Sequence, residues 1–385
     1  MNRANLGVSI FGAFLITSHV SADASRFTEI TPEWQNPPYR QYDFWIGVGK
    51  ANWRNKKPAN FFHDDQGSPA THWVYPTLNG KVLLEFAMGD DAADAAGTRV
   101  QGFSVRYFDT HKQRWVMAQE WPGRNATNGV GDQLQGFYRF GRIQVFSTYF
   151  IGTPEEERTR RYTFSDIRPE GFIWHGVNTR DQGKTWSAGT LVEFSKIRPA
   201  AEWPKPGKPF PNYDEGRLCD DPAYRGFDAL PGVWRGSRRD AQGKSDARLT
   251  AHHMLGGCAV MSFLEHQENG TPVTLLEVRS LSASKNDWWV YRLDSRPGTA
   301  HEYQLGHFEG GTISLYDNNQ YVIEDELTNL TLSKIERKDA NALKRTVWTT
   351  LSPNTLAFEW FERRNAEAAW QKTASFEFER ISSGR

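Results

Sequence analysis

Two residues in the first half of the chain have side chains suited to moving a proton. Glu85 stands in the apolar stretch 82–87 (VLLEFA), and His175 stands between Trp174 and Gly176. A carboxylate among apolar neighbours has a raised pKa, and a histidine titrates near neutral pH. If both side chains face one enclosed space, they predict acid–base chemistry on a bound molecule. The alternative for each is an outward-facing or hydrogen-bonded side chain.

Further residues are candidates for holding a ligand. Arg106 and Arg279 occupy matching positions in the two halves of the chain, and a guanidinium can anchor a carboxylate. Their shared position equally fits a structural role, such as closing a barrel by bonding backbone carbonyls. The other candidates lie near the end of each half: Trp174, Glu359 and Trp360. Glu359 matches His175, so the two halves differ there in charge.

The sequence offers little to a metal, a nucleotide or nucleic acid. His252 and His253 are adjacent, and neighbouring residues of a strand point to opposite faces, so one ion is not easily bound by both. The zinc helix pattern, the nucleophile elbow, the Walker loop and the dinucleotide fingerprint are absent from the sequence. Lys+Arg and Asp+Glu balance at 46 each, which argues against phosphate-backbone binding. We expect neither a metal nor a cofactor.

The chain is rich in aromatic residues, with 15 Trp, 24 Phe and 13 Tyr, and this richness favours sheets. Trp45 and Trp234 follow tight turns and are expected to plug the end of a barrel. Four other tryptophans suggest a stacking platform for sugars, with core packing as the alternative. They are Trp121, Trp203, Trp288 and Trp289.

An internal duplication positions these candidates. Residues 45–47 recur as 234–236, 78–80 as 255–257, 105–106 with Trp115 as 278–279 with Trp288, and 194–197 as 378–381. The order is kept, and the offset drifts only with loop length. Each copy alternates polar and apolar residues with turn signals at short spacing, which predicts about eight to ten strands per copy. Such meanders form barrels or sandwiches, and closure into a barrel removes exposed edges.

Four motifs resemble those of the DUF1579 family of lipocalin-like domains. They are the D-F-W-I-G run at 43–47, the L-G-G-C run at 255–258, residues 107–109 (YFD) followed by Trp115, and the D-Q-G-K-T-W turn at 181–186. The first copy departs from the family pattern at Asn79 and Lys81, where the family shows Gly and Cys, and the second departs at 366–369. The resemblance implies a calycin-type barrel and no common reaction. A weaker likeness, to the haem-binding nitrobindins, lies in the G-V-W-R-G run at 232–236 and would require an axial histidine.

The expected fold is therefore all-β, with two tandem antiparallel lipocalin-like (calycin-type) barrels at 40–197 and 228–382. A linker at 198–227 joins them and contains six prolines, so it cannot hold a sheet ladder. Cys219 and Cys258 form either one disulfide or two buried thiols. Residues 1–24 resemble a signal peptide, with cleavage near Ala24 and export to the periplasm or beyond; a membrane-anchored N-terminus is the alternative.

These patterns predict an exported protein that binds a small hydrophobic or aromatic molecule inside a barrel. The first alternative is an enzyme (an isomerase, lyase or hydrolase) that uses Glu85 and His175 as an acid–base pair. The second is a structural or protein-interaction pair of domains. No stretch after the leader is long or apolar enough to span a membrane, and the sequence names no partner protein.

Overall fold

The structure of the protein, a computed structural model, describes residues 27–55, 67–90, 99–122, 132–150, 157–181, 183–213, 219–282, 287–317, 323–325, 330–332 and 342–383. The predicted leader at 1–24 lies outside these residues. Among the described residues, no helix has the length and apolar character needed to cross a bilayer.

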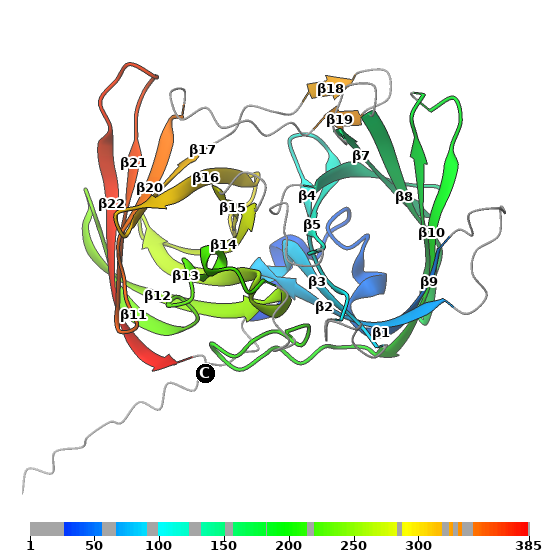
Figure 1. Cartoon of the computed structure of the whole chain (residues 1–385), viewed down its shortest axis with the longest axis horizontal. Helices are drawn as coiled ribbons and strands as arrows, with labels where there is room; N and C mark the ends of the chain where they lie inside the picture. The colour runs from blue at the N-terminus through cyan, green and yellow to red at the C-terminus, as the bar shows by residue number, and fades with distance from the viewer. Residues whose placement is uncertain are drawn as a thin grey trace, which may run out of the picture.

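Ten antiparallel strands close the first barrel, and each pairs with its sequence neighbours while β1 pairs with β10 (Figure 1). They are β1 (Gly47–Asn55), β2 (Ser68–Thr77), β3 (Val82–Gly89), β4 (Gln101–Asp109), β5 (Arg114–Glu120), β6 (Asp132–Arg139), β7 (Arg142–Phe150), β8 (Glu157–Arg168), β9 (Gly171–Thr179) and β10 (Ser187–Arg198). The short 3-10 helices η2 (Pro32–Trp34) and η3 (Asp43–Trp45) precede β1.

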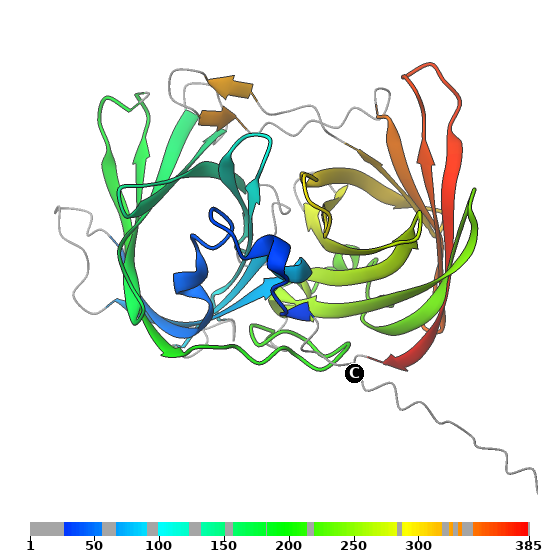
Figure 2. The ribbon, with the colours of Figure 1, turned by 180° about the vertical axis from the view of Figure 1, so that it is seen from behind.

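Ten more strands close the second barrel in the same order, and the two barrels lie side by side (Figures 1 and 2). They are β11 (Gly232–Asp240), β12 (Gly243–Met254), β13 (Ala259–Glu268), β14 (Thr271–Ser282), β15 (Asp287–Asp294), β16 (Glu302–Glu309), β17 (Thr312–Asp317), β20 (Lys344–Leu351), β21 (Thr355–Glu362) and β22 (Gln371–Ser383). Two short strands, β18 (Ile323–Asp325) and β19 (Leu330–Leu332), pair with each other, and β19 joins β7 of the first barrel. The predicted all-β fold of two tandem barrels is confirmed.

The duplication holds in detail at the turn after the second strand of each copy. Helices η4 (Leu78–Gly80) and η7 (Leu255–Gly257) occupy this turn, and Asn79 and Gly256 both take left-handed backbone angles, with φ of 61° and 57°. Such angles favour Gly and Asn, which explains the recurring L-N-G and L-G-G runs.

The predicted match between residues 45–47 and 234–236 is wrong by four residues. Gly47 pairs with Val74, and Gly232 pairs with Ala251, which is the counterpart of Val74 across the shared turn. Gly47 therefore matches Gly232, and Trp234 matches Gly49 rather than Trp45. Trp45 packs at the end of the first barrel as expected, whereas Trp234 lies inside β11, where its indole is fully buried and donates to the Leu230 carbonyl at 2.8 Å.

The proline-rich linker packs between the barrels instead of spanning open solvent. Trp203 and Phe210 of the linker belong to a core that includes the outer face of β2 to β4 and residues of the second barrel. The Phe210 ring stacks on Phe86 of β3 at 4.0 Å, and Trp203 lies 5.4 Å from Phe263 of β13. These ring contacts make the linker part of the interface between the barrels.

The residue that follows the short 3-10 helix in each copy bonds its barrel to another segment of the chain. Lys81, after η4, donates from Nζ to the carbonyls of Asp294 and Arg296, both at 2.8 Å, and of Thr299 at 2.9 Å in the second barrel. Cys258, after η7, forms a disulfide with Cys219 of the linker, which confirms the first of the two alternatives for the cysteines. Lys81, which stands where the second copy has Cys258, thus marks a contact between the barrels.

A buried histidine makes the interface sensitive to acid. The Tyr107 hydroxyl and Nδ1 of His301 share a hydrogen bond of 2.6 Å, and burial lowers the pKa of His301 to about 4. A depressed histidine contributes stability that is complete above its ordinary pKa and is lost as the pH falls towards the folded value. We expect stability to fall between about pH 6.5 and pH 4, by about 3 kcal/mol for this residue. Buried His252, with its pKa also lowered to about 4, adds a similar share.

Urea unfolding at a series of pH values measures this effect. In the variant His301→Gln, the slope of the unfolding free energy against pH should fall by about one proton in that window. An unchanged slope would show that His301 is not held neutral by the fold.

Candidate functional site

The interior of the first barrel holds a buried polar network above an aromatic plug. Alternate residues of β3 and β4 face this interior, so Leu83 and Glu85 point inward while Leu84 and Phe86 pack towards the second barrel. Trp45 of η3 closes one end of the barrel, with its ring 4.9 Å from Phe172. This alternation places the Glu85 side chain in the lumen, where a functional role was predicted for it.

Glu85 accepts hydrogen bonds from three side chains. Nδ1 of His72 and Nη2 of Arg106 each lie 2.6 Å from a carboxylate oxygen, and the Ser104 hydroxyl donates to the second oxygen. Burial alone would raise the pKa of Glu85, but the charge of Arg106 and the bonds from His72 and Ser104 outweigh it and lower the pKa to about 2. The predicted raised pKa is wrong. Glu85 stays ionised at neutral pH and holds its partners in place.

His175 lies on the outer face of β9. It pairs with Thr163 and Leu191, whereas its neighbour Trp174 pairs with Phe164 and packs inside the barrel. The expectation that Glu85 and His175 share one lumen is therefore wrong, because adjacent residues of a strand face opposite sides.

The histidine that meets Glu85 is His72 of β2, which the sequence analysis missed. The turn at η4 pairs Thr77 with Val82 and therefore Val74 with Glu85, so His72 is a diagonal neighbour of Glu85 on the same face. Counting residues outwards from this turn along both strands would have identified His72 as a neighbour of Glu85. Nε2 of His72 has no hydrogen-bond partner among the described residues. An imidazole held by a carboxylate can act as a general base, but His72 is only 2% exposed.

The second barrel contains the same network with two residues exchanged. Arg279 matches Arg106, Ser262 matches Glu85, and Glu277 matches Ser104. Nη1 of Arg279 donates to Ser262 at 2.7 Å and Nη2 donates to Glu277. Arg292 also donates to Glu277, with Nε at 2.8 Å. In both barrels the structure thus places the predicted ligand-binding arginine against a buried glutamate, and no backbone carbonyl accepts from it in the described residues.

A layer of aromatic side chains covers the polar network of the first barrel. The Trp53 ring stacks on His72 at 5.9 Å and lies 5.8 Å from Trp174 and 5.2 Å from Trp121. Tyr162 completes the layer, with its ring 4.6 Å from Trp174. All four rings are partly exposed, and Trp53, Tyr162 and Trp174 pack against the hydrophobic core of the first barrel. We call Trp53, Trp121, Trp174 and Tyr162 the aromatic floor.

At the matching level the second barrel has Arg238, Thr346 and Phe358 where the first has Trp53, Tyr162 and Trp174, and it also differs at one glycine. Tyr162 pairs with Gly176, and Thr346 pairs with Trp360, so Trp360 stands where the first barrel has glycine. Trp234 stands where the first barrel has Gly49, four residues from Trp53 along β1, so it lies towards the opposite end of its barrel. Trp360 lies 4.7 Å from Phe376, and its neighbour Glu359 faces outward to Lys372 at 3.0 Å. Of the tryptophans considered for a sugar platform, Trp121 joins the aromatic floor, and the other three are buried: Trp203, Trp288 and Trp289.

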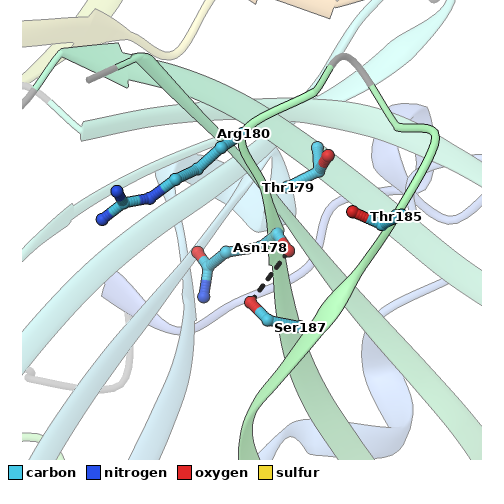
Figure 3. A pocket seen from close by; sticks show the side chains of 5 residues that line it. All are labelled: Asn178, Thr179, Arg180, Thr185 and Ser187. Atoms are coloured by element: carbon cyan, nitrogen blue, oxygen red, sulfur yellow. Dashed lines mark hydrogen bonds between the residues drawn. The ribbon is translucent and has the colours of Figure 1, made fainter. Parts of the chain in front are cut away.

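A pocket of about 330 Å³ lies at the end of the β9–β10 hairpin (Figure 3). Its lining residues are Asn178, Thr179, Arg180, Thr185 and Ser187. Asn178 follows Gly176 and Trp174 on the inward face of β9, and the Ser187 hydroxyl donates to the Asn178 carbonyl at 3.0 Å. The pocket therefore lies at the end of the β9–β10 hairpin, two residues beyond Gly176 on β9, and its lining includes no ring of the aromatic floor.

The described residues contain no group of three or more His, Cys, Asp or Glu side chains placed to hold a metal ion.

No family model and no curated protein matches this sequence. A solved structure of a protein of unknown function from the DUF3598 family of Nostoc punctiforme aligns with 90% of this chain and 100% of its own, at 10% identity and a TM-score of 0.23. A variant of transferrin binding protein B from Haemophilus parasuis aligns with 87% of this chain and 76% of its own, at 7% identity and a TM-score of 0.16. Both TM-scores are too low to support an inference about this protein. The membership in DUF1579 stays a prediction.

Proposed function

We propose that the first barrel binds one small aromatic or apolar molecule at its mouth, and that the second barrel is its structural partner. The observation that carries the proposal is the contrast between the two interiors. The first barrel has the partly exposed rings of Trp53, Tyr162 and Trp174 where the second has Arg238, Thr346 and Phe358, and a pocket lies at the end of its β9–β10 hairpin.

The chemistry of the floor supports an apolar or aromatic ligand. Pockets for small molecules are lined mostly by apolar and aromatic groups with a few polar anchors. Trp53, Trp121, Trp174 and Tyr162 offer ring faces and edges for stacking, and Asn178 and Ser187 offer polar groups at the rim. A ligand that loses about 200 Å² of apolar surface gains about 5 kcal/mol, which corresponds to a Kd of roughly 0.2 mM. Polar contacts at the rim would tighten this value.

The buried network beneath the floor has a positioning role in this account. His72 is fixed by Glu85, and Trp53 stacks on the His72 ring. Arg106, also held by Glu85, lies 4.1 Å from the ring of Trp45, the plug at the opposite end. The network therefore links the plug to the floor and keeps the rings of the floor from collapsing into the barrel.

The test is a titration of the full chain with N-phenyl-1-naphthylamine, an uncharged probe that fluoresces in apolar surroundings. We expect saturation at about one probe per chain. The variant Ser187→Trp places an indole in the pocket and should weaken binding by about tenfold or more.

The matched control is Ser195→Trp, because Ser195 is exposed on the same strand but faces outward, opposite to buried Phe194. This variant should bind as the unmodified chain does. Equal binding by both variants, or no binding by the unmodified chain, would contradict the proposal.

A further inference from the structure

A fully exposed phenylalanine lies at the tip of one hairpin of the first barrel. Strands β6 and β7 are joined by a two-residue turn, Phe140 and Gly141, between the paired residues Arg139 and Arg142. Phe140 is 98% exposed, the highest fraction among the large hydrophobic side chains of the described residues. A Cβ atom added at Gly141 would meet no described atom within 4 Å beyond its chain neighbours, so the turn projects from the barrel.

The backbone of this turn does not suit phenylalanine. Phe140 has a φ of 52° and Gly141 has a φ of 72°. Hairpin turns with two such angles favour Asn and Gly at both positions. A bulky side chain in the left-handed region is strained, and the exposed Phe140 ring gains no packing to offset that strain. Natural proteins break such local rules chiefly at functional sites.

The second copy has the residues that this backbone prefers. The β16–β17 hairpin is the counterpart, because Gly136 and Gly306 both pair with the tryptophan of the preceding strand. Its turn reads E-G-G-T at 309–312, and both glycines have positive φ, whereas the first copy reads R-F-G-R at 139–142. The fold therefore forms this turn without an exposed ring or flanking arginines, and the first copy has acquired both.

The arginines beside the turn form a cationic cluster. Arg139 and Arg142 are directly opposite each other across β6 and β7, and like charges in this arrangement repel. The guanidinium of Arg139 lies 4.8 Å from the centre of the Phe137 ring, and that of Arg114 from β5 lies 5.7 Å from the same ring. Within the described ranges, none of these three arginines forms an ion pair with a carboxylate. The hairpin tip therefore combines an exposed aromatic ring with uncompensated positive charge.

We propose that this tip docks reversibly on an anionic lipid bilayer, with the Phe140 ring in the interfacial layer and Arg139 and Arg142 on the headgroup phosphates. The inference is independent of the ligand proposed above. Aromatic side chains favour the membrane interface, and the surface potential of anionic lipids attracts each arginine. Headgroup phosphates between the two opposed arginines also relieve their mutual repulsion.

A bilayer fits the tip better than a protein partner does. Stable protein interfaces bury about 800 Å² on each partner around an apolar centre. Phe140 projects from a narrow turn, and among the described residues the other exposed large hydrophobic side chain of this hairpin is Tyr138. A lipid surface needs no matching shape, because its binding depends on buried apolar area and charge. Asp166 of the adjoining strand β8 is already paired with Arg168 at 2.7 Å.

Cosedimentation of the full chain with lipid vesicles tests the inference. We expect binding to vesicles of phosphatidylglycerol and phosphatidylcholine in equal parts, little binding to phosphatidylcholine alone, and weaker binding as salt is added. The variant Phe140→Gly should weaken binding by about tenfold or more. This variant should be at least as resistant to urea as the unmodified chain, because glycine suits the left-handed angle.

The double variant Arg139→Gln and Arg142→Gln should also weaken binding by about tenfold or more. The control is Val100→Ser, which removes a 70% exposed apolar side chain before β4, at the opposite end of the barrel, and should bind as the unmodified chain does. Equal binding of the unmodified chain to both kinds of vesicle, or to neither, would overturn the inference. Full binding by Phe140→Gly would overturn it as well, because the tip would then attract anions, such as acidic proteins, without entering a bilayer.

Discussion

Replacing Glu85 with serine should destabilise the first barrel by about 3–5 kcal/mol. Glu85 is the carboxylate that faces the buried charge of Arg106, and both side chains are 4% exposed or less. Removing one partner of a buried ion pair leaves the other charge without compensation, which costs more than the pair itself contributes. The same change removes the acceptor for Nδ1 of His72.

The second barrel shows how the loss can be repaired. There serine stands at the Glu85 position, and the glutamate stands across the strand pair, at the Ser104 position, where it accepts from Arg279. The double variant Glu85→Ser and Ser104→Glu should therefore recover more than half of the lost stability, because it returns a carboxylate to Arg106.

Hydrogen exchange of the amides in 82–89 and 101–109 measures the local opening free energy. The control Glu193→Gln removes an exposed carboxylate that pairs with Arg54, and it should change stability by less than about 1 kcal/mol. If the double variant is no more stable than Glu85→Ser alone, the two networks are not equivalent.

The second large effect is expected for Lys81→Met, at about 2–4 kcal/mol. Lys81 is 3% exposed, and its ammonium group donates to three carbonyls and one hydroxyl of the segment 294–299. Burial lowers its pKa to about 8, so it is charged at neutral pH. Methionine fills a similar volume but leaves these acceptors without a donor.

Hydrogen exchange in residues 294–301 should rise in Lys81→Met, because this segment of the second barrel is held from the first. The control Lys50→Met removes an exposed lysine that pairs with Asp90, and exchange there should stay as in the unmodified chain. Unchanged exchange in both variants would show that Lys81 does not fasten the barrels together.

The architecture followed from the sequence because its signals are local. The turns at 78–80 and 255–257 require left-handed backbone angles, and the Asn and Gly residues in these turns indicate such angles. Period-two alternation then fixed which residues share a face. The match of Trp45 with Trp234 was wrong because it was based on the shared tryptophan. The residues that correspond are the glycines at the start of β1 and β11, Gly47 and Gly232, which both have positive φ.

Only part of the site could be predicted from the sequence. Glu85 was placed in the lumen, but its partner depended on strand register, which a pattern of hydrophobicity does not define across long loops. His72 is close to Glu85 because of one tight turn, whereas His175 is separated from it by half of the barrel. The repeat aligned Glu85 with Ser262, but the compensating Glu277 was missed, because it stands where the first copy has Ser104 and the residue type is not kept there.

The most direct test of the central claim is a crystal structure of the full chain with 6-bromo-2-naphthoate, in which the bromine is located by its anomalous signal. The account predicts a bromine peak over the aromatic floor near Trp174. A bromine peak inside the second barrel, or peaks only on outer surfaces, would contradict it.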